Sequence, residues 1–223
     1  LDENSYDVPI DNGKFYTAIK LPANIKSGKH EIKIEASDPN ENEGYSSVEL
    51  EITAVPLYIK IELSSDQVNP GSKVLMKSSL FDQADDIINT SLGLELIDPS
   101  KNKVFVKIVQ SNEPIYYEFS QYAEPGLYSL ISTYKNLITQ QSINVTAIRD
   151  IKIKYENETV IIENIGNVPF GDDLTFIIQN ELKKYPITKS ISIDPGKILS
   201  IDLSKEVPFG IYDILLPSKE GVE

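Results

Sequence analysis

Apolar and polar residues alternate along most of this chain with a period of two, which is typical of strands that bury one face. Residues 17–36, 115–134 and 199–218 repeat one arrangement of these positions without gaps. In each copy an apolar residue is followed seven positions later by a glycine. A residue with a ring stands two positions after the glycine, and an aliphatic residue stands two positions after the ring. Each copy is therefore predicted to be a strand, a corner and a second strand. The glycines are Gly28, Gly126 and Gly210, and the rings are His30, Tyr128 and Tyr212.

The ring after each glycine occupies the position of a tyrosine corner in immunoglobulin-like sandwiches. There the hydroxyl can bond back to upstream backbone while the ring enters the core. We predict this structural role for His30, Tyr128 and Tyr212, although histidine departs from the pattern in the first copy. The glycines are 98 and 84 positions apart, which is about the length of one small sandwich.

The predicted fold is all-β, with tandem immunoglobulin-like β-sandwiches built from antiparallel sheets. Residues 1–55 are expected to form a partial sandwich whose N-terminal strands are missing. Residues 56–147 are expected to form a complete seven-stranded sandwich. Residues 148–223 are expected to form a third sandwich, whose closing strand is missing or lies beyond Glu223. Short linkers are predicted at Ala54–Pro56 and Ala147–Asp150.

The strand count differs among the three predicted domains. The first has strands predicted at Lys14–Leu21, Lys29–Ser37 and Ser46–Thr53, after an Asp11-Asn12-Gly13 turn. These strands are too few to bury a core, so the missing half is expected upstream, or this segment leans on its neighbour. The second domain is expected to hold strands at Leu57–Leu63, Lys73–Phe81, Leu92–Ile97, Lys103–Val109, Ile115–Ser120, Leu127–Tyr134 and Gln141–Thr146. The third is expected to hold strands at Ile151–Tyr155, Thr159–Ile165, Leu174–Gln179, Ile187–Ile193, Lys197–Leu203 and Gly210–Leu216.

Composition excludes several classes of function. The net charge is −13, from 34 acidic and 21 basic residues, which argues against binding nucleic acid or anionic lipid. The chain has no cysteine, so it has no disulfides and no thiol chemistry. No apolar run approaches the roughly 18 residues of a membrane span, and no signal peptide is visible, so the sequence reads as an internal fragment of a longer protein.

Short motifs in the second and third domains resemble known modules. Asn69-Pro70-Gly71, Leu96-Ile97-Asp98-Pro99 and Pro125-Gly126-Leu127-Tyr128 resemble macroglobulin-like and other immunoglobulin-like modules of secreted prokaryotic proteins. The segment 162–170, Asp194-Pro195-Gly196 and Gly210-Ile211-Tyr212-Asp213 resemble CARDB-like domains of archaeal surface proteins. The resemblance implies a stalk or envelope (S-layer) protein. These motifs specify a fold, and a fold does not give a function.

Two groups of residues are candidates for ligand binding. Asp38, Asn40 and Asn42 could offer oxygen ligands to Ca²⁺, whereas the alternative for the same loop is a solvated turn. Tyr116, Tyr117 and Tyr122 could form an aromatic platform for sugar, but the alternation places Tyr117 in the core. Three N-glycosylation sequons occur, about the number that chance gives, and Asn89 and Asn157 in predicted loops are better acceptors than Asn144 in a predicted strand.

We found no catalytic motif: no phosphate-binding loop, nucleophile elbow or pair of metal-ligating histidines. The sequence therefore predicts a non-enzymatic structural or adhesive spacer of a secreted or cell-surface protein, without a required cofactor. Its expected partners are neighbouring domains of the same chain, other surface subunits or glycans, but not nucleic acid or the membrane interior. One alternative is a carbohydrate- or peptide-binding accessory module of a larger enzyme or receptor, and another is an adhesin made rigid by Ca²⁺.

Overall fold

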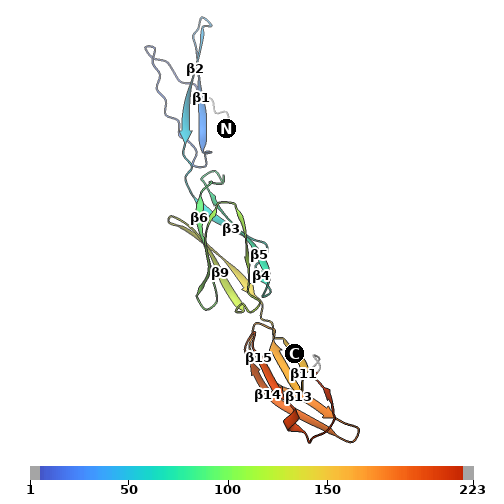
Figure 1. Ribbon diagram of the computed structural model, residues 1–223. Coiled ribbons are helices and arrows are strands. Elements are labelled where there is room, and N and C mark those ends of the chain that lie inside the picture. Colours follow the sequence, from blue (N-terminus) through green and yellow to red (C-terminus); the bar gives the residue numbers. More distant parts are fainter. Residues whose placement is uncertain (1–5, 218–223) are drawn as a thin grey trace. The chain divides into compact units, whose positions relative to one another are not determined.

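The computed structural model describes residues 6–217, and nearly all of its regular structure is β-strand (Figure 1). Among the described residues there is no α-helix, only one short 3-10 turn, η1 (Ser204–Glu206). Among the strand pairs whose register is known, all but one are antiparallel. The predicted all-β, antiparallel fold is therefore confirmed. The chain divides into two compact units: residues 1–58 with 81–88, and residues 59–80 with 89–223.

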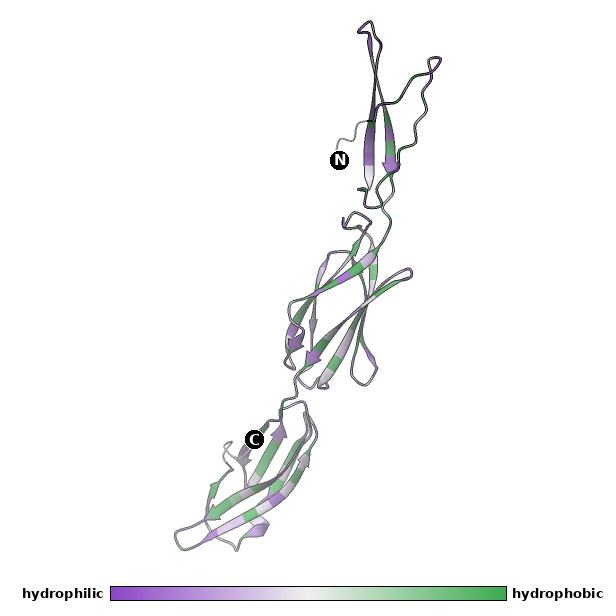
Figure 2. Ribbon diagram, turned by 180° about the vertical axis from the view of Figure 1, so that it is seen from behind, coloured by the Kyte–Doolittle hydropathy of each residue, from purple (hydrophilic) through white to green (hydrophobic). Residues whose placement is uncertain are grey.

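The first unit contains one antiparallel hairpin, β1 (Gly28–Ser37) and β2 (Glu43–Ile52). Hydrophilic and hydrophobic residues both occur along the hairpin (Figure 2). Because side chains alternate between the two sides of paired strands, the register gives the hairpin an apolar face and a charged face. Val48 on the apolar face is 51% exposed. Within the described part of this unit no second sheet covers that face. The apolar face consists of His30, Ile32, Ile34, Val48, Leu50 and Ile52.

The predicted strand at Lys14–Leu21 is wrong, although the turn before it is right. Asp11 and Lys14 exchange two backbone hydrogen bonds, and Asn12 and Gly13 both have positive φ, as a two-residue hairpin turn requires. The following residues form no ladder, and Leu21 is 43% exposed. An alternating pattern makes a strand only where a neighbouring strand accepts its hydrogen bonds, and here none does.

The first unit includes a buried aspartate from a distant part of the sequence. Asp82 is 1% exposed and its carboxylate accepts hydrogen bonds from the Ser27 hydroxyl and from the Ala84 and Asp86 N–H groups. Burial raises the pKa of Asp82, but these hydrogen bonds outweigh it, so the pKa lies below its usual value. The charged carboxylate therefore organises the turn at 82–86 and holds it to residue 27.

The central sandwich consists of two sheets that pack face to face. Ser78 and Ser132, from different sheets, are joined through their hydroxyls at 2.6 Å. Eight strands are present rather than the predicted seven, because a two-residue strand pairs parallel to the last one and is too short to show alternation. The five-stranded sheet has the order β4 (Gln67–Val68), β10 (Leu137–Val145), β9 (Gly126–Tyr134), β6 (Ser91–Ile97), β7 (Lys103–Gln110), and the other sheet β3 (Tyr58–Leu63), β5 (Lys73–Phe81), β8 (Pro114–Glu118).

Aromatic and aliphatic side chains fill the central core of this chain, which has neither cysteine nor tryptophan. Tyr117 and Phe119 of the β8 region meet edge to face at 4.9 Å, and Phe119 meets Tyr128 of β9 at 5.1 Å. Tyr117 also contacts Phe105 of β7 in the same way. These rings connect the two sheets in a core that contains no disulfide.

The C-terminal sandwich has two three-stranded sheets. Phe170 and Phe176 are fully buried between them, and Asn164 of one sheet donates to the Ile193 carbonyl of the other. All six strands were predicted, with boundaries that differ by up to four residues. The sheets have the orders β11 (Ile151–Glu156), β12 (Thr159–Asn164), β15 (Ile198–Asp202) and β14 (Lys184–Ile193), β13 (Phe170–Gln179), β16 (Asp213–Leu215).

A surface ion pair of the central sandwich gives a pH prediction. Hydrogen bonds from Lys77 and Lys60 lower the pKa of Glu62 to about 2. Because the pKa of Glu62 is lowered in the folded state, its ionised form stabilises the folded state at pH values above its ordinary pKa of 4.5. This stabilisation is lost as the pH falls through about 2. A carbon-13 NMR titration of Glu62 should show this low midpoint. In Lys77→Met the midpoint should move toward 4.5, and an unchanged midpoint would contradict the assignment.

Candidate functional site at the contact between the two sandwiches

Two of the three predicted corners share one geometry. Gly28 and Gly126 have φ of +109° and +124°, a region that favours glycine. Tyr128 is 3% exposed and is hydrogen-bonded to the backbone of Glu124, four residues upstream. Burial, with a smaller contribution from Asp98, raises the pKa of the Tyr128 phenol to about 12. His30 also contacts backbone four residues upstream, but its partner there is a carbonyl, with the His30 Nε2 2.8 Å from the Lys26 oxygen.

The third copy departs from this geometry. Tyr212 is half-buried, and its ring meets Tyr185 edge to face at 5.9 Å. Partial burial and the neighbouring Tyr185 raise the pKa of Tyr212. The residue four positions upstream is Pro208, which has no N–H to offer. The Tyr212 ring therefore packs on the core at the repeat position that Tyr128 also occupies. It cannot form a tyrosine-corner hydrogen bond with an N–H group four residues upstream.

Tyr128→Phe removes a buried hydroxyl and leaves its backbone partner without that bond. We expect the central sandwich to lose about 1–2 kcal/mol of unfolding free energy, measured by urea denaturation. Tyr212→Phe is the matched control, because its ring is half-exposed and has no such backbone partner. Equal effects of the two substitutions would contradict a corner at Tyr128.

The proposed calcium ligands form a closed turn between β1 and β2. Asp38 accepts hydrogen bonds from the Asn40 N–H and from both the N–H and the side-chain amide of Asn42. Those from Asn42 are the main reason that the pKa of Asp38 is lowered. The Asp98–Asn102 turn is bonded in the same way. Both turns share the sequence Asp-Pro-x-x-Asn, so this arrangement favours the solvated turn.

The three glycosylation candidates lie in different environments. Asn89 and Asn157 are exposed outside the strands, and Asn157 has a φ of +49° in the turn between β11 and β12. Asn144 is half-buried in β10, beside Gln67 of β4. Glycosylation at Asn89 and Asn157 stays a prediction, and access to Asn144 is poorer.

The three tyrosines of the suggested sugar platform do not share a face. Tyr116 points outward and is 71% exposed, whereas Tyr117 belongs to the aromatic core. Tyr122 lies against Gly196 of the C-terminal sandwich, where an added Cβ would come within 2.9 Å of its ring. The platform is therefore wrong, because neighbouring residues of a strand point to opposite faces.

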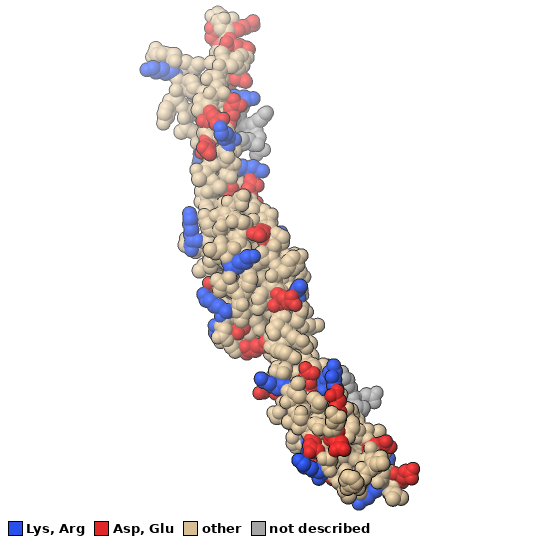
Figure 3. Space-filling view, viewed as in Figure 1, with Lys and Arg blue, Asp and Glu red and all other residues tan. Residues whose placement is uncertain are grey.

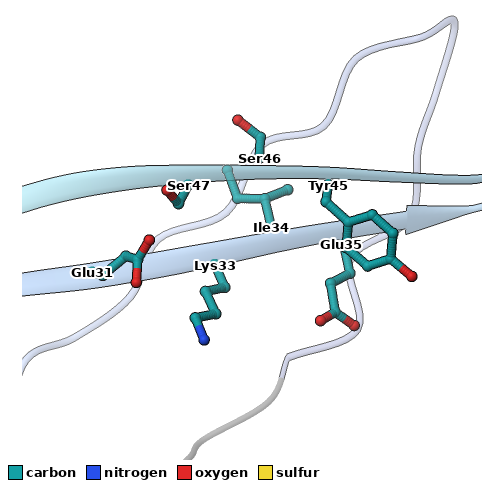
Figure 4. A pocket seen from close by; sticks show the side chains of 7 residues that line it. All are labelled: Glu31, Lys33, Ile34, Glu35, Tyr45, Ser46 and Ser47. Atoms are coloured by element: carbon teal, nitrogen blue, oxygen red, sulfur yellow. The ribbon is translucent and has the colours of Figure 1, made fainter.

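A shallow depression of 320 Å³ lies on the hairpin of the first unit (Figure 4). Glu31, Lys33 and Glu35 follow one another on the charged face of β1, and the ring of Tyr45 lies beside Glu35 (Figure 4). The described residues contain no group of three or more His, Cys, Asp or Glu side chains that could hold a metal ion. Such alternating charge is typical of a solvated strand face, and Lys and Asp/Glu are also interspersed over the face shown in Figure 3.

The most elaborate polar arrangement lies in the second unit, where the two sandwiches meet. Asn167, in the loop after β12, is 3% exposed. Its Nδ2 donates to the carbonyls of Ala123 and Thr146, both at 2.9 Å, and its Oδ1 accepts from the Ile148 N–H at 2.6 Å. One side chain thus binds a loop of the central sandwich, the end of β10 and the linker. All its hydrogen-bonding groups are used inside a buried contact, where such bonds count most.

A glycine and a second asparagine position Asn167. Gly166 is buried so closely against the linker that an added Cβ would lie 2.2 Å from the Ile148 carbonyl oxygen. Asn164, also fully buried, accepts from the Gly166 N–H and donates to the Val168 carbonyl. The linker in turn is held by bonds from the Ile165 and Gly166 N–H groups to the Asp150 carbonyl. The connection between the sandwiches is therefore bonded along its length.

Two further contacts complete this junction, which we define as residues 122–123, 146–150, 164–167 and 196. Tyr122 packs against Gly196, whose φ of +69° belongs to the Asp194-Pro195-Gly196 turn. Arg149 lies 4.4 Å above the Phe170 ring and donates to the Gly171 carbonyl. Several of these residues lie in motifs that indicate a fold, but nothing in the sequence shows that they lie together.

No protein-family model matches the sequence, and no curated protein is significantly similar to it. Solved structures that are similar to this chain include the native conformation of E. coli alpha-2-macroglobulin, at 11% identity and a TM-score of 0.37 over 80% of this chain. Another is a tetra-tandem repeat of a large adhesion protein, at 9% identity and a TM-score of 0.36 over 78% of this chain. The amphioxus IgVJ-C2 molecule matches at 16% identity and a TM-score of 0.32 over 65% of this chain.

The chain spans only 16% of that macroglobulin, 48% of the adhesin repeat and 73% of the amphioxus molecule. With TM-scores below 0.5, these similarities carry no argument about function. Within the described residues, no helix is long and apolar enough to cross a membrane.

Proposed function

We propose that this chain is a non-enzymatic structural or adhesive spacer segment of a secreted or cell-surface protein. The observation that carries the proposal is the junction around Asn167, which holds two sandwiches through a buried, fully bonded side chain. A flexible tether would need no such bonds, because a Gly/Ser-rich linker gives freedom without them. A bonded junction is useful where the spacing between attached modules has to be kept.

The surface supports this role. A net charge of −13 keeps the segment soluble and opposes collapse against neighbouring copies. The core depends on rings and aliphatic residues rather than disulfides, so it does not depend on the redox state of its surroundings. We place the segment outside the cell, with other domains of the same protein as its first partners. The domain boundaries at residues 55 and 147 are part of the same proposal.

The hairpin of the first unit fits a third module of this kind. Its apolar face has the alternation of a sandwich sheet, and its corner residue His30 contacts backbone four residues upstream, as Tyr128 does. We propose that residues 1–55 are part of a sandwich in which this apolar face packs against a second sheet.

The proposal predicts a fixed distance between the two sandwiches. Spin labels on Ile138→Cys and Leu182→Cys, both exposed and in different sandwiches, should give a narrow distance distribution by double electron–electron resonance. The absence of native cysteine makes this labelling specific. Adding Asn167→Ala removes three hydrogen bonds at once, so the distribution should broaden. A broad distribution in the unsubstituted junction would contradict the spacer role.

A further inference from the structure

Strand β7 forms a free edge of its sheet and is positively charged, whereas the chain as a whole is negatively charged. It is the last strand of the five-stranded sheet, so one side has no partner among the described strands. It carries Lys103 and Lys107 and no acidic residue, in a chain with a net charge of −13. Unpaired strand edges are templates for pairing with another chain.

The outer face of β7 is apolar. Val104, Val106 and Ile108 occupy alternate positions and are 40%, 63% and 75% exposed. Phe105 and Val109, between and beside them, point toward the core. The strand therefore presents three β-branched side chains in a row beside a free backbone edge, which is an unusual exposure for a soluble domain.

The direction of the free backbone groups follows from the ladder. The Ser111 N–H donates to the Thr90 carbonyl at 2.8 Å. In an antiparallel pair the bonded residues alternate, so the backbone groups of Phe105, Lys107 and Val109 face β6. Those of Val106 and Ile108 consequently point to the free edge.

Strand β2 has the complementary properties. It belongs to a two-stranded sheet and carries Glu43, Glu49 and Glu51 but no basic residue. The Asp38 N–H donates to the Asn42 carbonyl, so by the same alternation Val48 and Leu50 bond to β1. The backbone groups of Glu49 and Glu51 then point to the free edge.

We propose that β2 of one copy adds, in parallel, to the β7 edge of a second copy. In a parallel pair a residue bonds to the two residues that flank its neighbour, so Val106 would bond to Glu49 and Glu51 and lie beside Leu50. An antiparallel pairing of the same edges would place Val106 directly opposite Glu49 on one face. The backbone groups that point to the two free edges therefore favour the parallel arrangement, because only that arrangement brings Val106 beside the apolar Leu50.

In this register both faces match. Val104 lies beside Val48, and Ile108 beside Ile52, so the apolar rows continue one another. On the other face Lys107 lies beside Glu51 and opposes pairing of β7 with itself, because like charges would meet. The contact joins different surfaces and therefore builds open chains of copies. It does not rest on the spacer role and could fail while that role holds.

A disulfide experiment tests the register directly. Neighbouring Cα atoms across such a pair are about 4.8 Å apart, which suits a disulfide. A mixture of Val106→Cys and Leu50→Cys chains, one labelled with nitrogen-15, should form a mixed two-chain product under mild oxidation. Replacing Leu50→Cys by Glu49→Cys, on the opposite face, should slow it at least about tenfold. Equal rates, or no mixed product, would overturn the proposal.

A charge exchange supplies a second test without cysteine. The unsubstituted chain should associate with concentration in sedimentation velocity, and Lys107→Glu should weaken this association at least about tenfold. Mixing Lys107→Glu with Glu51→Lys chains should restore it. A chain that stays monomeric up to about 1 mM, or a Lys107→Glu variant that associates unchanged, would overturn the proposal.

Discussion

Gly166→Ala is expected to lower the stability of the C-terminal sandwich by about 3 kcal/mol or more. The new Cβ would lie 2.2 Å from the Ile148 carbonyl oxygen and 2.9 Å from the Asp150 nitrogen. Both neighbours are backbone atoms, so neither can rotate away as a side chain would. The linker must move, and the bonds that the Ile165 and Gly166 N–H groups donate to Asp150 are lost with it. Urea denaturation followed by amide signals of β12 measures the change.

Gly171→Ala is the matched control for this prediction. Gly171 is the second residue of β13 in the same sandwich, and an added Cβ there would meet nothing closer than 3.9 Å. Its effect should stay within about 1 kcal/mol. If Gly166→Ala were as mild as the control, the close approach of linker and loop would be wrong.

Phe119→Ala is expected to lower the stability of the central sandwich by about 3–5 kcal/mol. The ring is 2% exposed and packs edge to face on Tyr117 and Tyr128, so its removal leaves a cavity at the meeting point of the two sheets. Hydrogen exchange separates the effects, because the Leu130 amide reports the central sandwich and the Ile162 amide reports the C-terminal one.

Phe209→Ala is the control, since that ring is fully exposed and its loss should change stability by less than about 0.5 kcal/mol. An equal loss of protection at Leu130 and Ile162 in Phe119→Ala would show that the two sandwiches unfold as one. Unchanged protection at both would show that Phe119 does not join the sheets.

The alternation of apolar residues was sufficient to predict the sandwiches. Strands such as β5 and β9 bury every second residue, so their pattern and their environment agree. The same pattern failed at residues 14–21, because no sheet accepts that segment. Periodicity reports which face of a strand would be buried, but not whether a partner exists. Strand β4 was missed because it has only two residues, which are too few to show an alternation of apolar and polar positions.

The corner repeat was partly predictable. Gly28 and Gly126 share a positive φ, and His30 and Tyr128 share a bond to backbone four residues upstream. The third copy has the same residue types, yet its ring contacts Tyr185 instead. A ring two positions after the repeat glycine predicts core packing. The tyrosine-corner hydrogen bond also depends on which residue lies four positions before the ring.

The junction was the least predictable feature. Asn167 and Gly166 lie in a motif that marks a domain type, and nothing in their spacing shows that they contact Ala123 or the linker. Contacts between segments 44 residues apart come from the packing of two folded sandwiches. An Asn-x-x-Asn pattern after a strand with a glycine between, Asn164 to Asn167, is the signal that could have raised the question.

We propose that the junction around Asn167 holds the two sandwiches as one body. Residual dipolar couplings measured for backbone amides of β9 and β13 test this directly, because each sandwich reports its own alignment tensor. We expect one common tensor for both sandwiches in the unsubstituted chain and two different tensors in Asn167→Ala. Two different tensors in the unsubstituted chain would show independent tumbling and would contradict the claim.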